Sequence, residues 1–242
     1  MLPGRPLLRF STTLPTATPG LRATRSLMLA ASVLLMSCEP GAWEEPAIPR
    51  TATVCGVDES GSIRPELRAA AREACVRTLQ RLEAGWTEVR SINQRSLTNE
   101  QSLVRLERHP ASCPNNFSAR CRAAVVRDSL AYARALDAAV ARVREPPAAL
   151  SRQTDIVGFL AAATQALEAD PDAAGTIVMA TDLDETVHRR ADLDLAGAAI
   201  EVWLQQPEDP AAAERRRAEF AAAMRAAGAS AVSFYPLPAH WK

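Results

Sequence analysis

The chain has 242 residues, of which 48% are hydrophobic, so it is long enough for one domain with a buried core plus additional segments. Its 28 basic and 28 acidic residues give a formal net charge of zero. Because a nucleic-acid-binding domain normally carries a strongly basic surface, this balance predicts no nucleic-acid partner.

Residues 1–37 are arranged like an export signal. Residues 1–26 contain no acidic residue, and the apolar segment LMLAASVLLMSC follows at 27–38. That segment is shorter than the roughly 20 apolar residues that a membrane-spanning helix needs. Its ending, LMSC, resembles the lipobox of bacterial lipoproteins, which implies that Cys38 becomes the lipidated first residue of the mature chain. Cleavage of an ordinary secretory signal, which would release a soluble protein, is the alternative.

Residues 38–50 are rich in proline and glutamate, a composition typical of an extended tether between an anchor and a domain. We therefore expect an exported protein that is held at a membrane by a lipid on Cys38 and faces the periplasm or the cell surface. The folded domain is expected at 51–238.

The cysteine count agrees with a lipid on Cys38. Four cysteines remain after it, and in an oxidising compartment four cysteines can form two disulfides with three possible connectivities. Cys113 and Cys121 flank a short loop and are the favoured pair, which leaves Cys55 and Cys75. Structural zinc is not expected, because there is no CxxC motif and the three histidines are scattered.

Hydrophobic periodicity and turn residues predict alternating strands and helices. Pro65 in the first turn and Gly85 after the last turn delimit the first helix, and two alternating segments after it predict an antiparallel pair of strands. A long helix follows, with its apolar stripe expected to face the core, within a segment at 109–147 that also carries the Cys113–Cys121 loop. In chain order, the predicted elements are strand 52–57, helix 64–84, strands 86–93 and 101–108, helices 118–145 and 155–169, strands 175–185 and 198–206, helix 209–227 and strand 230–237.

This order predicts an α/β fold, a Rossmann-like three-layer sandwich. We expect a mostly parallel central sheet with one antiparallel edge strand and with helices on both faces. The continuous apolar character of 175–185 predicts a central parallel position for that strand.

Oxygen-bearing side chains lie at the ends of two predicted strands. The sequence TATVCGVDESGS at 51–62 places one carboxylate and two hydroxyls after the first strand, and a second carboxylate ends the strand at 175–185. Ligand sites in such sheets form beyond the carboxyl ends of the strands. With a threonine at a helix start, the candidate ligands are Asp58, Ser60, Ser62, Thr154 and Asp182.

All five side chains offer oxygen, which favours Mg²⁺, with Mn²⁺ or Ca²⁺ as alternatives, over zinc or copper. A cation held mainly by neutral hydroxyls stays electrophilic and attracts a carboxylate from another molecule. Simple capping of the following helix by Asp58 or a serine is the other interpretation of the first turn.

The same residues resemble the metal-ion-dependent adhesion site of the von Willebrand factor type A domain family. That site has Asp-x-Ser-x-Ser after the first strand, a Thr before the third helix and an Asp after the fourth strand. The segments DESGS at 58–62, QTDIVGFLAAATQAL at 153–167 and IVMATDLDE at 177–185 match these elements in order. Leu183 departs from the pattern, because the family usually has glycine there.

The resemblance implies a role for each ligand. Ser60, Ser62 and Thr154 would bind the metal directly, and Asp58 and Asp182 would act directly or through water. The free coordination position would take a Glu or Asp of a partner protein. The family consists mostly of non-catalytic adhesion and assembly modules, so we expect no enzyme and no catalytic residues.

Two other functions are kept as alternatives. A structural envelope lipoprotein with a degenerate site that binds no metal would account for Leu183. The segment DLDET at 182–186 also resembles the opening of haloacid dehalogenase-like phosphatases, with Asp182 as nucleophile and Asp184 as acid and base. That phosphatase motif normally opens its domain, and here little chain follows it.

Overall fold

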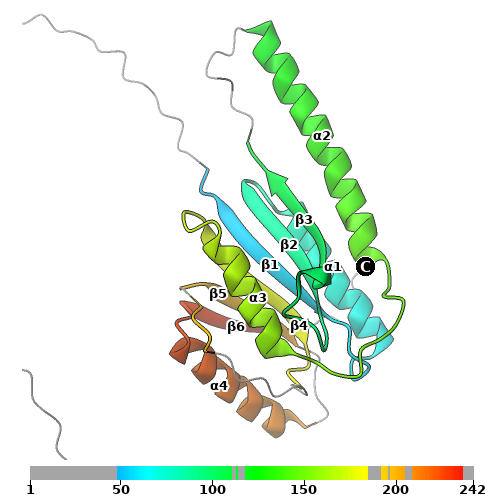
Figure 1. The fold of residues 1–242 in the computed structure, drawn as a ribbon, viewed down its shortest axis with the longest axis vertical. Coiled ribbons are helices and arrows are strands. Elements are labelled where there is room, and N and C mark those ends of the chain that lie inside the picture. Colours follow the sequence, from blue (N-terminus) through cyan, green and yellow to red (C-terminus); the bar gives the residue numbers. More distant parts are fainter. Residues whose placement is uncertain are drawn as a thin grey trace, which may run out of the picture. The chain divides into compact units, whose positions relative to one another are not determined.

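A six-stranded sheet organises the protein in the computed structural model (Figure 1), with strand order β3-β2-β1-β4-β5-β6. The structure describes residues 48–110, 113, 118–184, 192–195, 197–204 and 209–236, all within one compact unit, Glu45–Lys242. The elements are β1 (Thr51–Asp58), α1 (Pro65–Gln80), β2 (Gly85–Ile92), η1 (Asn99–Gln101), β3 (Ser102–Arg108), α2 (Ala119–Arg144), α3 (Ile156–Glu168), β4 (Ala174–Thr181), β5 (Ala199–Leu204), α4 (Pro210–Ala226) and β6 (Ala231–Pro236). The expected export signal, Cys38 and most of the tether lie outside the described residues.

The sheet confirms the predicted fold class. Every neighbouring pair of strands is parallel except β2 and β3, which pair antiparallel at the edge. β4 lies between β1 and β5, the central parallel position predicted for it. Because the parallel strands run in one direction, Asp58 at the end of β1 and Thr181 at the end of β4 lie at the same edge of the sheet.

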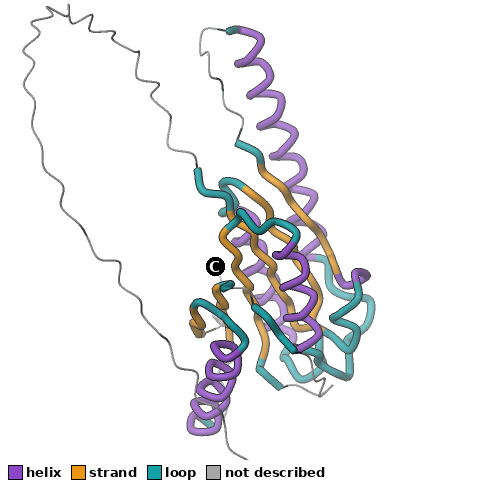
Figure 2. Tube along the Cα trace, turned by 60° about the vertical axis from the view of Figure 1, so that its left-hand side comes forward, coloured by secondary structure: helices purple, strands orange, loops and turns teal. Residues whose placement is uncertain are grey.

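Helices cover both faces of the sheet, and two apolar clusters form the core. On one face, Cys55 and Val57 of β1 pack with buried residues of α1 and with the end of α2. On the other face, Ala52 and Val54 pack with α3 and with Met224 of α4. β1 therefore buries alternate residues on opposite faces, as a central strand of a three-layer sandwich must. Figure 2 shows helices on both sides of the strands.

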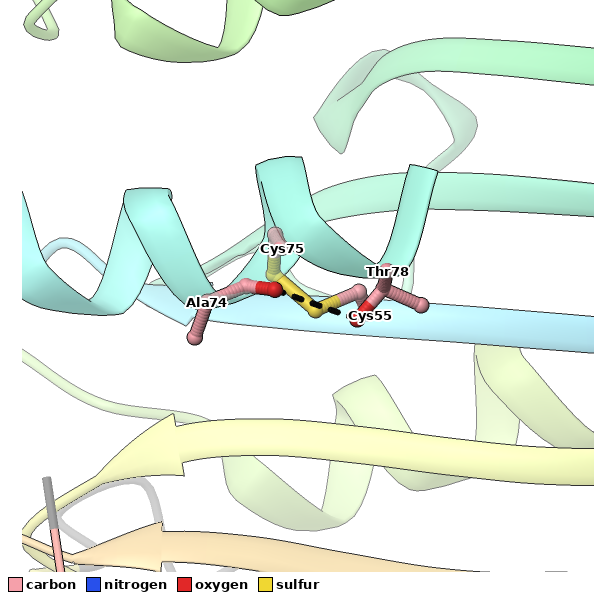
Figure 3. The surroundings of a disulfide bond; sticks show 4 residues. All are labelled: Cys55, Ala74, Cys75 and Thr78. Atoms are coloured by element: carbon pink, nitrogen blue, oxygen red, sulfur yellow. Dashed lines mark hydrogen bonds between the residues drawn. A yellow bond between two sulfur atoms is a disulfide. The ribbon is translucent and has the colours of Figure 1, made fainter. Parts of the chain in front are cut away.

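Both disulfides that the cysteine spacing favoured are present. Cys113 is bonded to Cys121 in the first turn of α2, with 5.9 Å between their Cα atoms. Cys55 of β1 is bonded to Cys75 of α1, with Cα atoms 5.7 Å apart, and both cysteines are fully buried (Figure 3). The second bond closes a loop of about 20 residues that contains the whole DESGS turn, and a loop of this size stabilises a fold by roughly 3 kcal/mol.

The end of the first helix was predicted wrongly. α1 ends at Gln80 and not at 84, and Gly85 does not cap it but begins β2. Gly85 has φ +104°, and a Cβ there would lie 1.9 Å from the carbonyl oxygen of Thr51. The glycine is therefore required where β2 and β1 come close at the start of the sheet.

The apolar stripe of the long helix faces the core over only part of its length. Ala139 and Val143 near the C-terminal end are buried, whereas Ser129 and Ala133 nearer the middle of the helix are exposed. Figure 1 shows the first half of α2 extending past the sheet. Among the described helices, none is long and apolar enough to cross a membrane.

Candidate metal site

Asp58 is a fully buried carboxylate at the end of β1. Its Oδ1 accepts the backbone N–H of Ser60 at 2.8 Å, and its Oδ2 accepts the hydroxyl of Thr181 at 2.8 Å. Within the described part of the chain, no arginine or histidine forms an ion pair with it. Burial is the main reason that the pKa of Asp58 is raised to about 6. Hydrogen bonds from Ser60 and Thr181 lower this pKa, and the nearby charge of Asp182 raises it further.

Ser60 and Ser62 present their hydroxyls to one another. The two Oγ atoms lie 2.8 Å apart, with Ser60 buried and Ser62 exposed. Two adjacent ligands of an octahedral Mg²⁺, each about 2.1 Å from the ion, lie about 3 Å apart. The two hydroxyls form an ordinary hydrogen bond, whose length is also compatible with neighbouring ligands of Mg²⁺, and the exposure of Ser62 opens the site to solvent.

The loop before α3 lies against the DESGS turn. The N–H of Gly61 donates to the carbonyl of Ser151 at 2.9 Å, and the N–H of Ser151 donates to the carbonyl of Glu59 at 3.0 Å. Thr154, three residues further along this loop, is buried, and Asp155 caps α3 by accepting the N–H of Gly158. The predicted start of this helix at 155 is confirmed, because Asp155 is its N-cap.

Asp182 is half-buried directly after β4, and its Oδ1 accepts the N–H of Asp184 at 3.0 Å. The structure thus brings Asp58, Ser60 and Ser62 into one hydrogen-bonded turn. Asp182 lies close enough to raise the pKa of Asp58, and backbone hydrogen bonds join the loop that contains Thr154 to the same turn. Among the described residues there is no cluster of three or more His, Cys, Asp or Glu side chains suited to a metal. The candidate set contains only two carboxylates, so its ligands are mainly hydroxyls.

Leu183 adopts the backbone conformation that glycine favours. Its φ is +61°, and its N–H donates to the Oγ of Thr181 at 3.1 Å. The left-handed conformation costs a non-glycine residue about 1–2 kcal/mol. The side chain of Leu183 packs against the cluster beneath α3, which offsets part of that cost. Leucine at this position therefore does not prevent the turn that carries Asp182.

Two buried arginines of α1 bind the DESGS turn on the side that faces α1. The sequence analysis did not identify either of them. Arg68 donates to the carbonyl of Ser60 at 3.1 Å and also to that of Ile63. Arg72 forms a buried ion pair with Glu59, with 2.6 Å and 2.7 Å from its Nη2 to the two carboxylate oxygens. Arg68 and Arg72 share a helical stripe with Cys75 and Leu79, and this spacing was the available signal for their inward position.

The fold and its geometry define an α/β sandwich with oxygen-bearing side chains at the carboxyl ends of β1 and β4. No family model and no curated protein matches the chain. Among solved structures, the chain is similar to proximal thread matrix protein 1 (PTMP1) from the mussel byssus, with a TM-score of 0.40 and 10% identity over 78% of this chain and 44% of that one. It is also similar to the human COPII-coat protein Sec24c, with a TM-score of 0.36 and 13% identity over 78% of this chain and 30% of that one. The chain thus spans less than half the length of either protein, and similarities this weak carry no functional argument.

Proposed function

We propose that this protein is a divalent-cation-dependent protein-binding module of the bacterial cell envelope, related to von Willebrand factor type A domains. Asp58 carries the proposal, because it is fully buried and has no cationic partner among the described residues. A buried carboxylate normally gains a counter-charge, and here a second carboxylate, Asp182, lies near it instead. A divalent cation would neutralise both.

The remaining candidate ligands suit a hard cation. Ser60, Ser62 and Thr154 supply neutral oxygens, which Mg²⁺ accepts together with water, and Mn²⁺ or Ca²⁺ would be bound by the same groups. When bound, the ion would supply an open coordination position for a carboxylate of another protein. The proposed activity is binding without catalysis.

Removal of one hydroxyl tests this assignment. Thr154→Ala is expected to lower the affinity for Mg²⁺ and Mn²⁺ at least about tenfold, because loss of even a group that only orients a metal ligand typically costs about 10–100-fold, while the folded structure is kept. Isothermal titration calorimetry with each ion measures the effect. Thr78→Ala removes a hydroxyl that only bonds to its own helix, to the carbonyl of Ala74, and is the matched control. Equal affinities of Thr154→Ala and the control would reject Thr154 as a ligand.

The alternative of a structural lipoprotein with a site that binds no metal has one observation in its favour. Asp58 already accepts hydrogen bonds from Ser60 and Thr181, and with a pKa of about 6 it can be accommodated in protonated form. The response of stability to added cations separates this alternative from the main proposal. No observation favours the phosphatase alternative, and its Thr186 lies outside the described residues.

We also propose that the protein is exported and anchored by a lipid on Cys38. The two disulfides support an oxidising compartment. Cys38→Ser in the full chain, expressed in a bacterium, is expected to move the protein from the membrane fraction to the soluble fraction. Quantitative immunoblotting of the two fractions measures the shift. Membrane retention of the Cys38→Ser protein would rule out the anchor.

A further inference from the structure

Three exposed arginines stand on the three loops that surround the candidate metal site. Arg64 follows the DESGS turn and precedes α1, Arg95 lies in the turn after β2, and Arg152 lies in the loop before α3. We refer to Arg64, Arg95 and Arg152 as the arginine rim. Figure 2 shows these connecting loops, drawn in teal, gathered beyond one end of the sheet.

Hydrogen bonds hold the three loops together, so the rim residues belong to one surface. Ser151, next to Arg152, pairs with Gly61 through its carbonyl, and its Oγ accepts the N–H of Gln94, next to Arg95, at 3.4 Å. The N–H of Glu59 donates to the carbonyl of Ile92 at the end of β2 at 3.0 Å. Each rim arginine therefore lies within three residues of a residue that contacts or belongs to the DESGS turn.

The positive charges of the rim are not neutralised by the described residues. None of the three guanidinium groups forms an ion pair within the described ranges, whereas other arginines do: Arg72 pairs with Glu59, and Arg144 with Glu73. The exposed acidic residues closest in sequence to the rim arginines are Glu66, Glu100 and Glu145, and Glu145 pairs with Arg142 instead of with the rim. Unpaired guanidinium groups bind carboxylates in a planar, bidentate arrangement.

We propose that the arginine rim binds an acidic segment of the partner protein. This inference rests on the proposed function, in which one carboxylate of the partner reaches the cation, and it adds that neighbouring carboxylates of the same segment bind the rim. A single carboxylate at the cation would select weakly among proteins. A cluster of carboxylates matched to three arginines supplies selectivity and accelerates association through electrostatic attraction.

The test uses a fluorescent hexaglutamate peptide as the probe and fluorescence anisotropy as the measurement. The triple variant Arg64→Gln, Arg95→Gln, Arg152→Gln is expected to bind the peptide at least about tenfold more weakly than the unchanged protein, the combined effect of three exposed charge pairs. The matched control removes three exposed arginines of α4, Arg215, Arg216 and Arg225, with the same change in net charge. The control variant is expected to bind the peptide as the unchanged protein does.

Each titration is made in EDTA and again with Mg²⁺, which separates the rim from the cation. Rim-dependent binding in EDTA that weakens as salt rises supports the inference, even if Mg²⁺ adds nothing and the proposed cation site fails. Three results would each overturn the inference. They are an unchanged affinity of the triple variant for the peptide, an equal loss of affinity in the α4 control, and no binding of hexaglutamate by the unchanged protein. Unchanged thermal unfolding of the triple variant confirms that it is folded.

Discussion

Arg72→Met is expected to lower the free energy of unfolding by about 3–5 kcal/mol, because it leaves the carboxylate of Glu59 buried without its partner. Glu59 is 3% exposed and Arg72 is 7% exposed, so water cannot replace the lost guanidinium without rearrangement of the DESGS turn. Urea unfolding monitored by circular dichroism measures the loss.

The double variant Glu59→Leu, Arg72→Met, which replaces the pair with apolar side chains, is the matched control for that experiment. It removes both charges of the pair, and such replacements are often close to neutral in stability. We therefore expect it to recover most of the stability that Arg72→Met loses. If Arg72→Met unfolds within about 0.5 kcal/mol of the unchanged protein, as ordinary surface substitutions do, the ion pair does not hold the turn.

Asp58→Asn is expected to stabilise the metal-free protein at pH 7.5 by up to about 3 kcal/mol. The pKa of Asp58 is about 6 in the folded protein and 3.8 in the reference state, and each pKa unit corresponds to 1.36 kcal/mol. The folded state therefore binds the proton more tightly than the unfolded state. The contribution of this group to stability is present below pH 3.8 and is lost as the pH rises through about 6.

Urea unfolding at several pH values between 4 and 8, in EDTA, measures this contribution. The unchanged protein is expected to lose stability from this group across that range, and Asp58→Asn, which resembles the protonated acid, is expected to lack that loss. Asp172→Asn, an exposed carboxylate in the turn before β4, is the control and should follow the unchanged protein. An Asp58→Asn variant that is less stable than the unchanged protein at pH 7.5 without metal would contradict the account.

The positions of the site residues could be predicted because strand ends are visible in the sequence. Asp58 is the polar residue at the end of the first apolar strand, and Asp182 follows the most continuous apolar segment of the chain. The parallel arrangement then brings both to one edge of the sheet. The role of Thr181 was missed, because a threonine inside an apolar strand gives no sign that its hydroxyl donates to a carboxylate on the neighbouring strand.

Other features depend on contacts that periodicity does not reveal. The spacing of Arg68 and Arg72 places them on the inward side of α1, but it does not reveal the partners that allow two charged side chains to be buried there, which are Glu59 and two carbonyl groups. The spacing of apolar residues in α2 shows which side of the helix is apolar, but it does not show where the neighbouring structure ends. The assignment of Gly85 to a helix cap failed for a similar reason, since its function is the close approach of two strands.

Thermal unfolding of the chain from residue 39 onward, in EDTA and then with excess Mg²⁺, Mn²⁺ or Ca²⁺, tests the proposed cation site most directly. Binding to the native state alone at a hundredfold excess over Kd stabilises it by about 2.7 kcal/mol, which raises Tm by roughly 5–10 °C for a domain of this size. The account predicts such a rise in the unchanged protein and a rise smaller by about half or more in Ser60→Ala, because a tenfold weaker affinity leaves about 1.4 kcal/mol at the same ion concentration. A well-folded protein whose Tm responds to none of the three ions would contradict it and favour a structural lipoprotein in which Asp58 is accommodated without metal.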